Sequence, residues 1–481
     1  MTGDSNPASG RDADSGATFA RWGYSFGFGL FTLALVPRLY TAFHWGREPV
    51  WDGHYYDFGA RRIALGLGYS DDLPVGGHPV WHPWCHYPVG YSAFLGLFYR
   101  ILGATTGVAA FADALTGALL AVVTWLLARW ALSERRAAWA GLAVALHPGL
   151  IVYAALELTE PLAALLTLTA FWLAVRDAVP KRGLLVGAWV LGVAALVRPQ
   201  ALLCAPFLAL VLPADRRAST WSRAKHLARS GTVALFLSIL PVLPWTARNC
   251  RVMDGCALVS TNGGWNLAIG AFPRATGRFE TLRSSDGCRD VTGQVQQDRC
   301  WLAYGLAEIW NHPWHWLSLV PAKLGFTFDH ESFAVEYLHE VAPSVWTEPR
   351  RVAARSITSL AERALVCAAA LGALAFRPHG RGARVQGALA VLWAGLIYAA
   401  CAREPMFWPL VLFASAVPWL PLPGSAGFRP ALLLPVALLA TTVLTHAVFF
   451  GEDRYHIVVV PVFCMLAASA LRGGRSEVSW P

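Results

Sequence analysis

The segment GVAAFADALTGALLAVVTWLLA, from Gly107 to Ala128, indicates the fold class of this chain. It stays apolar over a length that lets one α-helix cross the hydrocarbon core of a bilayer. Similar blocks recur along the 481 residues, of which 56% are hydrophobic and only 14% are charged. A soluble domain carries about a quarter charged residues. Since lipid admits only helices and closed barrels, the sequence predicts an all-α polytopic membrane protein.

The positions of these blocks predict about twelve transmembrane helices. They lie at residues 22–43, 107–128, 137–155, 160–175, 183–197, 200–213, 231–247, 355–376, 385–401, 405–420, 430–449 and 455–471. Several blocks are short, so the number of spans could differ by one or two. Residues 1–21 are polar and lack the pattern of a cleaved signal peptide. We expect a disordered cytoplasmic tail there.

Lysine and arginine residues predict the orientation of the spans, because they collect in cytoplasmic loops. With twelve spans and a cytoplasmic N-terminus, every basic cluster falls on the cytoplasmic side, together with the C-terminal tail 472–481. The clusters are Arg129, Arg135 and Arg136; Arg176, Lys181 and Arg182; Arg216, Arg217, Arg223, Lys225 and Arg229; Arg377, Arg381 and Arg384; and Arg472 with Arg475. The net charge of +9 then reflects membrane anchoring, not nucleic-acid binding. The expected location is a bacterial cytoplasmic membrane.

Two long loops, residues 44–106 and 248–354, then face the extracytoplasmic side. The first loop lies within an N-terminal transmembrane module (22–247), and the second separates that module from a C-terminal one (355–471). The apolar stretch from Trp314 to Phe328 would invert all later spans if it crossed the membrane. We therefore expect an interfacial helix there, with Trp310, Trp314 and Trp316 at headgroup depth. Tyr91 to Leu102 is a second interfacial candidate.

Five of the nine cysteines fall in these two loops, where disulfides would persist. Cys288–Cys300 and Cys250–Cys256 are plausible pairs. The alternative is that all are free, since spacing alone does not fix pairing.

The first loop holds the leading catalytic candidate, Asp52, within Trp51-Asp52-Gly53-His54-Tyr55-Tyr56-Asp57. A carboxylate at a membrane boundary suits a general base that takes a proton from an incoming hydroxyl. A solvated aspartate or a helix cap is the alternative. The loop also carries histidines and further aspartates that could bind a divalent metal or line a polar pocket. These are His44, His54, His78, His82, His86, Asp71 and Asp72.

Ionisable residues also gather at the outward ends of spans. Glu157 and Glu160 stand at a turn between two spans, where a buried carboxylate is costly and tends to be functional. Four arginines oppose the positive-inside trend, and guanidinium groups pair well with phosphate. The alternative is a pair within the chain, with Glu404, Glu452 or Asp453 as partner. The four are Arg198, Arg248, Arg403 and Arg454.

The order of these parts resembles the GT-C superfamily of membrane glycosyltransferases. The nearest branch is the bacterial one related to protein O-mannosyltransferases and the lipid A aminoarabinose transferase. The resemblance rests on Asp52 soon after the first span, Ala60 to Tyr69, Tyr87-Pro88-Val89-Gly90-Tyr91, Glu160-Pro161, Val197-Arg198-Pro199, Pro244 to Asn249, Asn262 to Gly270, Ala275-Thr276-Gly277 and Asp453-Arg454-Tyr455.

The resemblance implies a polyprenyl-phosphate sugar donor, an outer-face active site and inversion at the anomeric centre. It implies Asp52 as the base and Glu160 as a residue that shapes the cavity. The residues expected to bind substrate are Asp57, Tyr55, His54, Arg198, Arg248, Asn262, Asn266, Arg454 and Tyr455. It also implies that no metal cofactor is needed, although the histidines keep a divalent metal open. The acceptor, whether lipid, glycan or protein, stays open.

One departure from the family concerns the residue after Asp52. Many relatives have an acidic residue there, whereas this chain has Gly53. Asp57 or Glu160 could substitute. Two other classes compete: a twelve-span secondary transporter, which predicts two similar halves, and a non-catalytic scaffold or lipid-linked sugar flippase, which would tolerate loss of Asp52.

Overall fold

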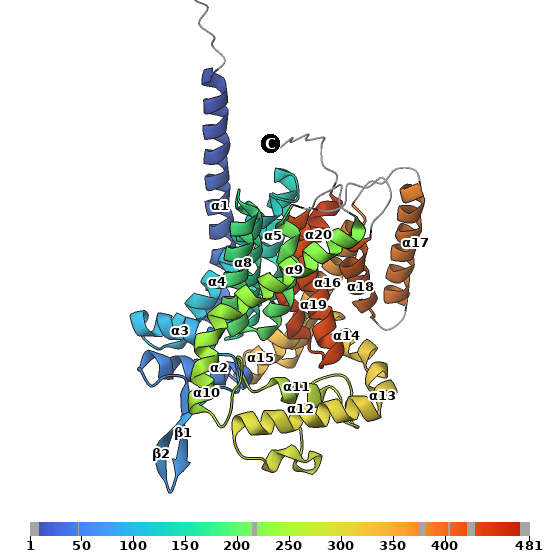
Figure 1. Cartoon of the computed structure of the whole chain (residues 1–481). Coiled ribbons are helices and arrows are strands. Elements are labelled where there is room, and N and C mark those ends of the chain that lie inside the picture. Colours follow the sequence, from blue (N-terminus) through green and yellow to red (C-terminus); the bar gives the residue numbers. More distant parts are fainter. Residues whose placement is uncertain are drawn as a thin grey trace, which may run out of the picture.

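The computed structural model describes residues 9–46, 48–213, 219–375, 381–402, 405–420 and 429–471. Long helices run side by side as a bundle, and shorter helices form a layer across one end of it (Figure 1). The all-α polytopic membrane fold predicted from the sequence is confirmed. The bundle helices are α1 (Ser9–Trp45), α4 (Thr106–Ala128), α5 (Glu134–Leu146), α6 (Pro148–Val152), α7 (Glu160–Arg176), α8 (Pro180–Val197), η2 (Pro199–Val211), α9 (Thr220–Ile239), α10 (Leu243–Val252), α16 (Glu348–Gly372), α17 (Arg381–Ala402), α18 (Trp408–Ala416), α19 (Pro430–Val448) and α20 (Val460–Ala470).

A helix occupies each of the twelve predicted blocks, but fewer meet the length and apolar composition of a full span. Among the described residues, seven helical stretches do so. The pair α5–α6, bent by 51°, makes an eighth if it counts as one span. The seven stretches are residues 23–45, 106–128, 180–197, 220–252, 382–402, 430–448 and 453–470.

Prolines explain much of this difference. α5 stops at Leu146 because His147 precedes Pro148, and the residue before a proline is disfavoured in a helix. η2 starts at Pro199 and contains Pro206, and it adopts the tighter 3₁₀ form. The block 405–420 is cut to a short helix that begins at Trp408.

The two long loops, 44–106 and 248–354, pack together at one end of the bundle. The Thr261 amide donates to the Cys85 carbonyl at 2.9 Å, and the Gln294 side chain accepts from the Cys85 amide at 3.0 Å. The elements of this layer are α2 (Trp51–Ala64), α3 (Val89–Leu102), α11 (Gly263–Ile269), α12 (Gln294–Asn311), α13 (Pro313–Ser318), α14 (Val320–Phe328), α15 (Phe333–Val341) and an antiparallel hairpin of β1 (Ser70–Val75) and β2 (His78–Pro83), in which Ser70 pairs with Pro83.

The two expected interfacial helices have different outcomes. α3 lies across the end of the bundle, as an interfacial helix would (Figure 1), and exposes apolar side chains such as Ile101. The stretch from Trp314 to Phe328 is instead broken into α13 and α14, and α14 buries Leu324 and Phe328 in the protein core. The expectation of one interfacial helix there was wrong, because Pro321 allows a second helix to start and turn inward.

The expected tails are described only in part. α1 already begins at Ser9, within the segment 1–21 expected to be disordered. Once an apolar span has formed a helix, its extension into polar residues costs little. Residues 1–8 and the tail 472–481 lie outside the described residues. Both predicted disulfides, Cys250–Cys256 and Cys288–Cys300, are present.

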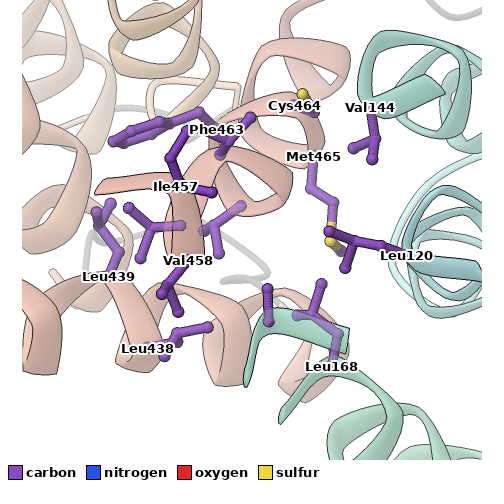
Figure 2. Close-up of a cluster of buried hydrophobic side chains, with 14 of the residues drawn as sticks. Leu120, Val144, Leu168, Leu438, Leu439, Ile457, Val458, Phe463, Cys464 and Met465 are labelled. Atoms are coloured by element: carbon purple, nitrogen blue, oxygen red, sulfur yellow. The ribbon is translucent and has the colours of Figure 1, made fainter. Parts of the chain in front are cut away.

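The two transmembrane modules share one core. Buried apolar side chains from the N-terminal helices α4, α5 and α7 meet side chains from α19, the 3₁₀ segment η7 (Asp453–Val459) and α20 (Figure 2). Within a membrane, such close packing holds helices together where the hydrophobic effect does not. The labelled residues are Leu120, Val144, Leu168, Leu438, Leu439, Ile457, Val458, Phe463, Cys464 and Met465.

The tightest helix contact in this core generates a stability prediction. A Cβ at Gly372 of α16 would collide with the Leu466 carbonyl of α20, whereas one at Gly387 of α17 would meet nothing. We expect Gly372→Ala to lower the free energy of unfolding by about 1–3 kcal/mol through overpacking. Gly387→Ala should leave it unchanged or raise it by about 0.5–1 kcal/mol. Thermal unfolding of both variants in one detergent checks this; equal midpoints would contradict the packing.

Candidate active site

Asp52 is held by an unusual start to α2. Trp51 has a φ of 51°, in the left-handed region that side chains other than glycine rarely adopt. Its ring packs edge-on against Phe333 and Tyr337, with centroids 5.4 and 5.6 Å away. Gly53 is buried, and a Cβ there would collide with the Tyr337 hydroxyl. A side chain at position 53 would require the Tyr337 hydroxyl to shift.

The Asp52 carboxylate joins two distant parts of the chain. Its Oδ2 atom accepts from Nη1 of Arg454 at 2.6 Å, and its Oδ1 accepts from the Tyr87 hydroxyl at 2.7 Å. Arg454 also faces Glu452, with a nitrogen–oxygen distance of 2.6 Å. The Arg454 side chain is only 13% exposed, whereas Asp52 and Glu452 keep 23% and 24% of their surface exposed. The cluster is therefore buried on the arginine side and open on the carboxylate side.

A second ion pair lies against the ring of Tyr455, which Arg454 also contacts. Arg198, just after α8, donates to Glu160 at 2.6 Å and to Thr159 at 3.0 Å. The guanidinium of Arg198 is 5.2 Å from the centroid of the Tyr455 ring, and that of Arg454 is 5.0 Å from it. The two guanidinium groups are thus within about 10 Å of each other. We call Asp52, Glu160, Arg198, Glu452 and Arg454 the carboxylate–arginine cluster.

Electrostatics separate the roles of the two carboxylates on Arg454. Burial raises the pKa of Asp52, but Arg454, Tyr87 and His86 together outweigh it and lower that pKa below its usual value. For Glu452, burial dominates and raises the pKa to about 7, with Arg454 opposing and Asp453 adding to the rise. Asp52 is therefore ionised at neutral pH, while Glu452 exchanges its proton near pH 7.

The segment η7, which carries Arg454, is anchored by contacts of its neighbouring residues. Asp453 accepts hydrogen bonds from the backbone amide of Phe333 and the hydroxyl of Ser332, both at 2.8 Å, at the start of α15. The buried His456 donates to the Thr327 carbonyl at 2.8 Å and faces Glu331 at 2.9 Å. These contacts fix the position of η7.

Comparison with known proteins bears on this arrangement. Residues 86–245 match the family model described as dolichyl-phosphate-mannose-protein mannosyltransferase. The predicted resemblance to protein O-mannosyltransferases is confirmed. The matched stretch contains Tyr87, Glu160 and Arg198, while Asp52 and Arg454 lie outside it. No curated protein matches the chain by sequence.

Two solved structures are similar in outline. The oligosaccharyltransferase AglB from Archaeoglobus fulgidus, in complex with an inhibitory peptide and a dolichol-phosphate, is 14% identical, with a TM-score of 0.41. The match covers 95% of this chain and 56% of AglB, so the chain spans little more than half of that protein. ArnT from Cupriavidus metallidurans, bound to undecaprenyl phosphate, is 16% identical, with a TM-score of 0.36 and coverage of 92% and 75%. Both TM-scores are too low for either structure to inform the site.

Some residues expected from the mannosyltransferase resemblance lie elsewhere. Asp57 follows Asp52 by five residues, which turns it to another helix face, and it binds Arg61 at 2.7 Å and Tyr99 at 2.5 Å. Arg248 donates to the carbonyls of Tyr69 and Trp84, at 2.6 and 3.0 Å, and so ties the two loops together. The structure does not bring either side chain into the carboxylate–arginine cluster.

Of the remaining expected residues, some lie beside the carboxylate–arginine cluster and some lie away from it. The Tyr55 ring is stacked 5.8 Å from Trp84 and lies 5.6 Å from Tyr87, and His54 is exposed beside it. The Tyr455 ring contacts both arginines of the cluster. Asn262 precedes α11 and accepts from the Ser260 hydroxyl at 2.9 Å, and Asn266 lies on α11. Among the described residues, neither asparagine forms a hydrogen bond with the cluster.

The sequence did not predict the contacts of Tyr87 and Thr159. Glu452 was considered only as an ion-pair partner of Arg454, the alternative to phosphate binding. The ion pair between Arg454 and Glu452 is present, and Arg454 also binds Asp52. The alternative pair of Arg403 with Glu404 lies outside the described residues. Tyr87 opens the quoted Tyr-Pro-Val-Gly-Tyr motif, which was the available signal.

The histidines of the first loop are divided: His86 packs 4.9 Å from the Tyr87 ring beside Asp52, whereas others lie on the hairpin. His82 pairs with Asp71 on the hairpin, at 2.8 Å. Within the described ranges, no group of three or more His, Cys, Asp or Glu side chains is arranged to hold a metal ion. Metal independence stays a prediction from the family resemblance.

The raised pKa of Glu452 generates a pH prediction. Below pH 7 this carboxyl is neutral, which leaves more of the Arg454 charge available to an anion; above pH 7 it is ionised and competes. Affinity for a phosphodiester, which keeps one negative charge over this range, should therefore fall roughly tenfold as pH rises from 6 to 8. Glu452→Gln should hold affinity near its low-pH value. Glu340→Gln, at an exposed position on α15, is the control, and a pH profile that survives Glu452→Gln would refute the assignment.

Proposed function

We propose that this protein is an integral membrane glycosyltransferase that moves a sugar from a polyprenyl-phosphate donor to an extracytoplasmic acceptor. One observation carries the proposal: an open carboxylate, Asp52, shares its buried arginine with Glu452 at the end of the bundle where both long loops meet. The family model supports the donor class, since its description names a dolichyl-phosphate sugar. The acceptor is a lipid, a glycan or a protein.

The donor phosphate is recognised by the two arginines. Arg454 and Arg198 flank the Tyr455 ring and together offer two positive charges at the depth of a lipid phosphate. Both are paired with carboxylates in the structure. An incoming phosphate therefore competes with Asp52 and Glu160 for the same guanidinium groups.

This competition prepares the base. While Arg454 holds Asp52, the carboxylate is a weak proton acceptor, because the arginine lowers its pKa. When the phosphate draws Arg454 away, that lowering is relieved and Asp52 becomes more basic. Donor binding and activation of the base are then coupled through one side chain.

The transfer itself is a single inverting displacement. Asp52 takes the proton of the acceptor hydroxyl as its oxygen attacks the anomeric carbon from the face opposite the phosphate. The bond from the anomeric carbon to the phosphate oxygen breaks, and the polyprenyl phosphate leaves with the electron pair. Arg454 and Arg198 stabilise its developing charge. Tyr55 and His54, exposed beside Asp52, form the side from which the acceptor approaches.

The location of the reaction follows from the charge distribution. The basic clusters at the opposite ends of the spans mark the cytoplasmic side by the positive-inside rule. The carboxylate–arginine cluster then faces the extracytoplasmic leaflet, where a lipid-phosphate donor needs no nucleotide. A bacterial cytoplasmic membrane is the proposed setting, and the arginines supply the positive charge in place of a required metal.

Loss of the base generates the central functional prediction. Asp52→Asn keeps a hydrogen-bond acceptor for Tyr87 and Arg454 but removes the proton acceptor, so turnover should fall by about 10²–10⁴-fold while donor binding is retained. Asp57→Asn, on the same helix but facing Arg61, should retain most turnover. Mass spectrometry of lipid-linked sugars and envelope glycans should show one polyprenyl-phosphate sugar accumulating in cells with Asp52→Asn. Normal turnover in that variant would reject the base.

Removal of the phosphate ligand is the matching prediction. Arg454→Ala should weaken donor affinity by about 10–100-fold, the usual worth of a charge-assisted hydrogen bond. Arg251→Ala, at an exposed position on α10, should leave affinity unchanged. Equilibrium binding of a fluorescent polyprenyl-phosphate sugar to purified protein measures both, and equal affinity for the wild type and Arg454→Ala would remove Arg454 from the site.

A further inference from the structure

A cavity of about 920 Å³ opens at the end of the bundle far from the carboxylate–arginine cluster. It lies between the turn after α4, the end of α7, the start of α8 and the start of α19. α7 links the two regions, because Glu160 is its first residue and Arg176 its last. At 1.5 Å per residue, these two positions are roughly 24 Å apart, close to the thickness of a bilayer core.

Three arginines line this cavity, and two of them are unbalanced. Arg129 pairs with Glu134 at 2.8 Å. Among the described residues, neither Arg176 nor Arg429 has a carboxylate partner; Arg176 stacks 4.3 Å from the Trp172 ring, and the Arg429 side chain is exposed. The cavity's other carboxylate, Asp177, faces Arg182 at 3.5 Å outside the lining. The cavity therefore carries an excess of positive charge.

The rest of the lining suits a lipid. Trp130, which is 45% exposed, and Trp172 border the cavity, and tryptophan favours the boundary between headgroups and acyl chains. Leu126, Val175 and Val211 provide apolar wall beneath them. A ligand that fits must combine a phosphate-like anion with an apolar tail, because guanidinium groups bind phosphate well and the wall is apolar.

We propose that this cavity binds the phosphate headgroup of an anionic membrane lipid in the leaflet opposite the active site. Arg176 and Arg429 hold the phosphate, and the tryptophans cover the glycerol and the first part of the chains. Basic pockets between transmembrane helices recognise anionic headgroups in this way. The site lies about one helix length from Glu160 of the carboxylate–arginine cluster, so it is separate from the proposed binding of the donor.

The test uses the full chain in nanodiscs and native mass spectrometry. Phosphatidylglycerol and phosphatidylcholine are supplied in equal amounts, and the lipid retained on the protein is counted. The wild type should retain phosphatidylglycerol, and Arg176→Gln with Arg429→Gln should reduce this at least about tenfold. Arg135→Gln, at an exposed position on the same end of the bundle but outside the cavity lining, should retain it.

Each other outcome contradicts the proposal. Equal retention by the double variant would show that the arginines do not hold the lipid, and equal loss in Arg135→Gln would show only a general effect of charge. Displacement of the lipid by millimolar inorganic phosphate would identify a soluble phosphate as the ligand and overturn the lipid assignment. Since Arg429 is exposed, Arg429→Gln alone should fold normally and lose part of the binding, which keeps the test valid if the double variant is unstable.

Discussion

The ion pair between Asp52 and Arg454 is the constraint on which the rest of the site depends. It joins the first loop to the last transmembrane segment, across 402 positions of the chain. A buried charge left without its partner is strongly destabilising, so the fold must bring these two segments together. The structure supports both segments: the strained Trp51 packs against the rings of Phe333 and Tyr337, and Asp453 and His456 fix η7. In the proposed function a phosphate displaces Asp52 from Arg454, so the stabilising interaction is also the one that the reaction uses.

The packed core also helps to position Arg454. η7 contributes Ile457 and Val458 to the packed cluster that joins both transmembrane modules (Figure 2). Arg454 is three residues before Ile457, so its backbone position is set by helices from both halves of the chain. A site built on such a packed element is held more accurately than one on a free loop. The packed core therefore places Arg454 where its guanidinium group meets the carboxylates of Asp52 and Glu452, each at 2.6 Å.

The sequence predicted the parts of this protein that depend on local pattern. Apolar blocks located the helices, and the loop cysteines suggested both disulfides. Asp52, Glu160, Arg198 and Arg454 were expected from their positions at span ends, and they do form the cluster. Other features depend on helix face, on hydrogen-bond partners and on a local proline. Asp57 lies on a different helix face from Asp52, Arg248 donates to the carbonyls of Tyr69 and Trp84, and α14 turns inward after Pro321. Composition does not show these features, because each depends on local helix geometry or on contacts made only in the fold.

The two ends of the bundle use arginine in opposite ways. In the carboxylate–arginine cluster, three carboxyl groups meet two guanidinium groups, so a phosphate enters only where it displaces an acid or where Glu452 is protonated. Such a site binds its anion weakly and releases it readily, which suits the proposed reaction, in which a lipid phosphate is the product. In the distant cavity, Arg176 and Arg429 form no ion pair with a carboxylate among the described residues, so a phosphate there displaces no partner from them. An anion held without competition exchanges slowly. Pairing therefore distinguishes a site of turnover from a site of lasting attachment, although both are built from the same side chain.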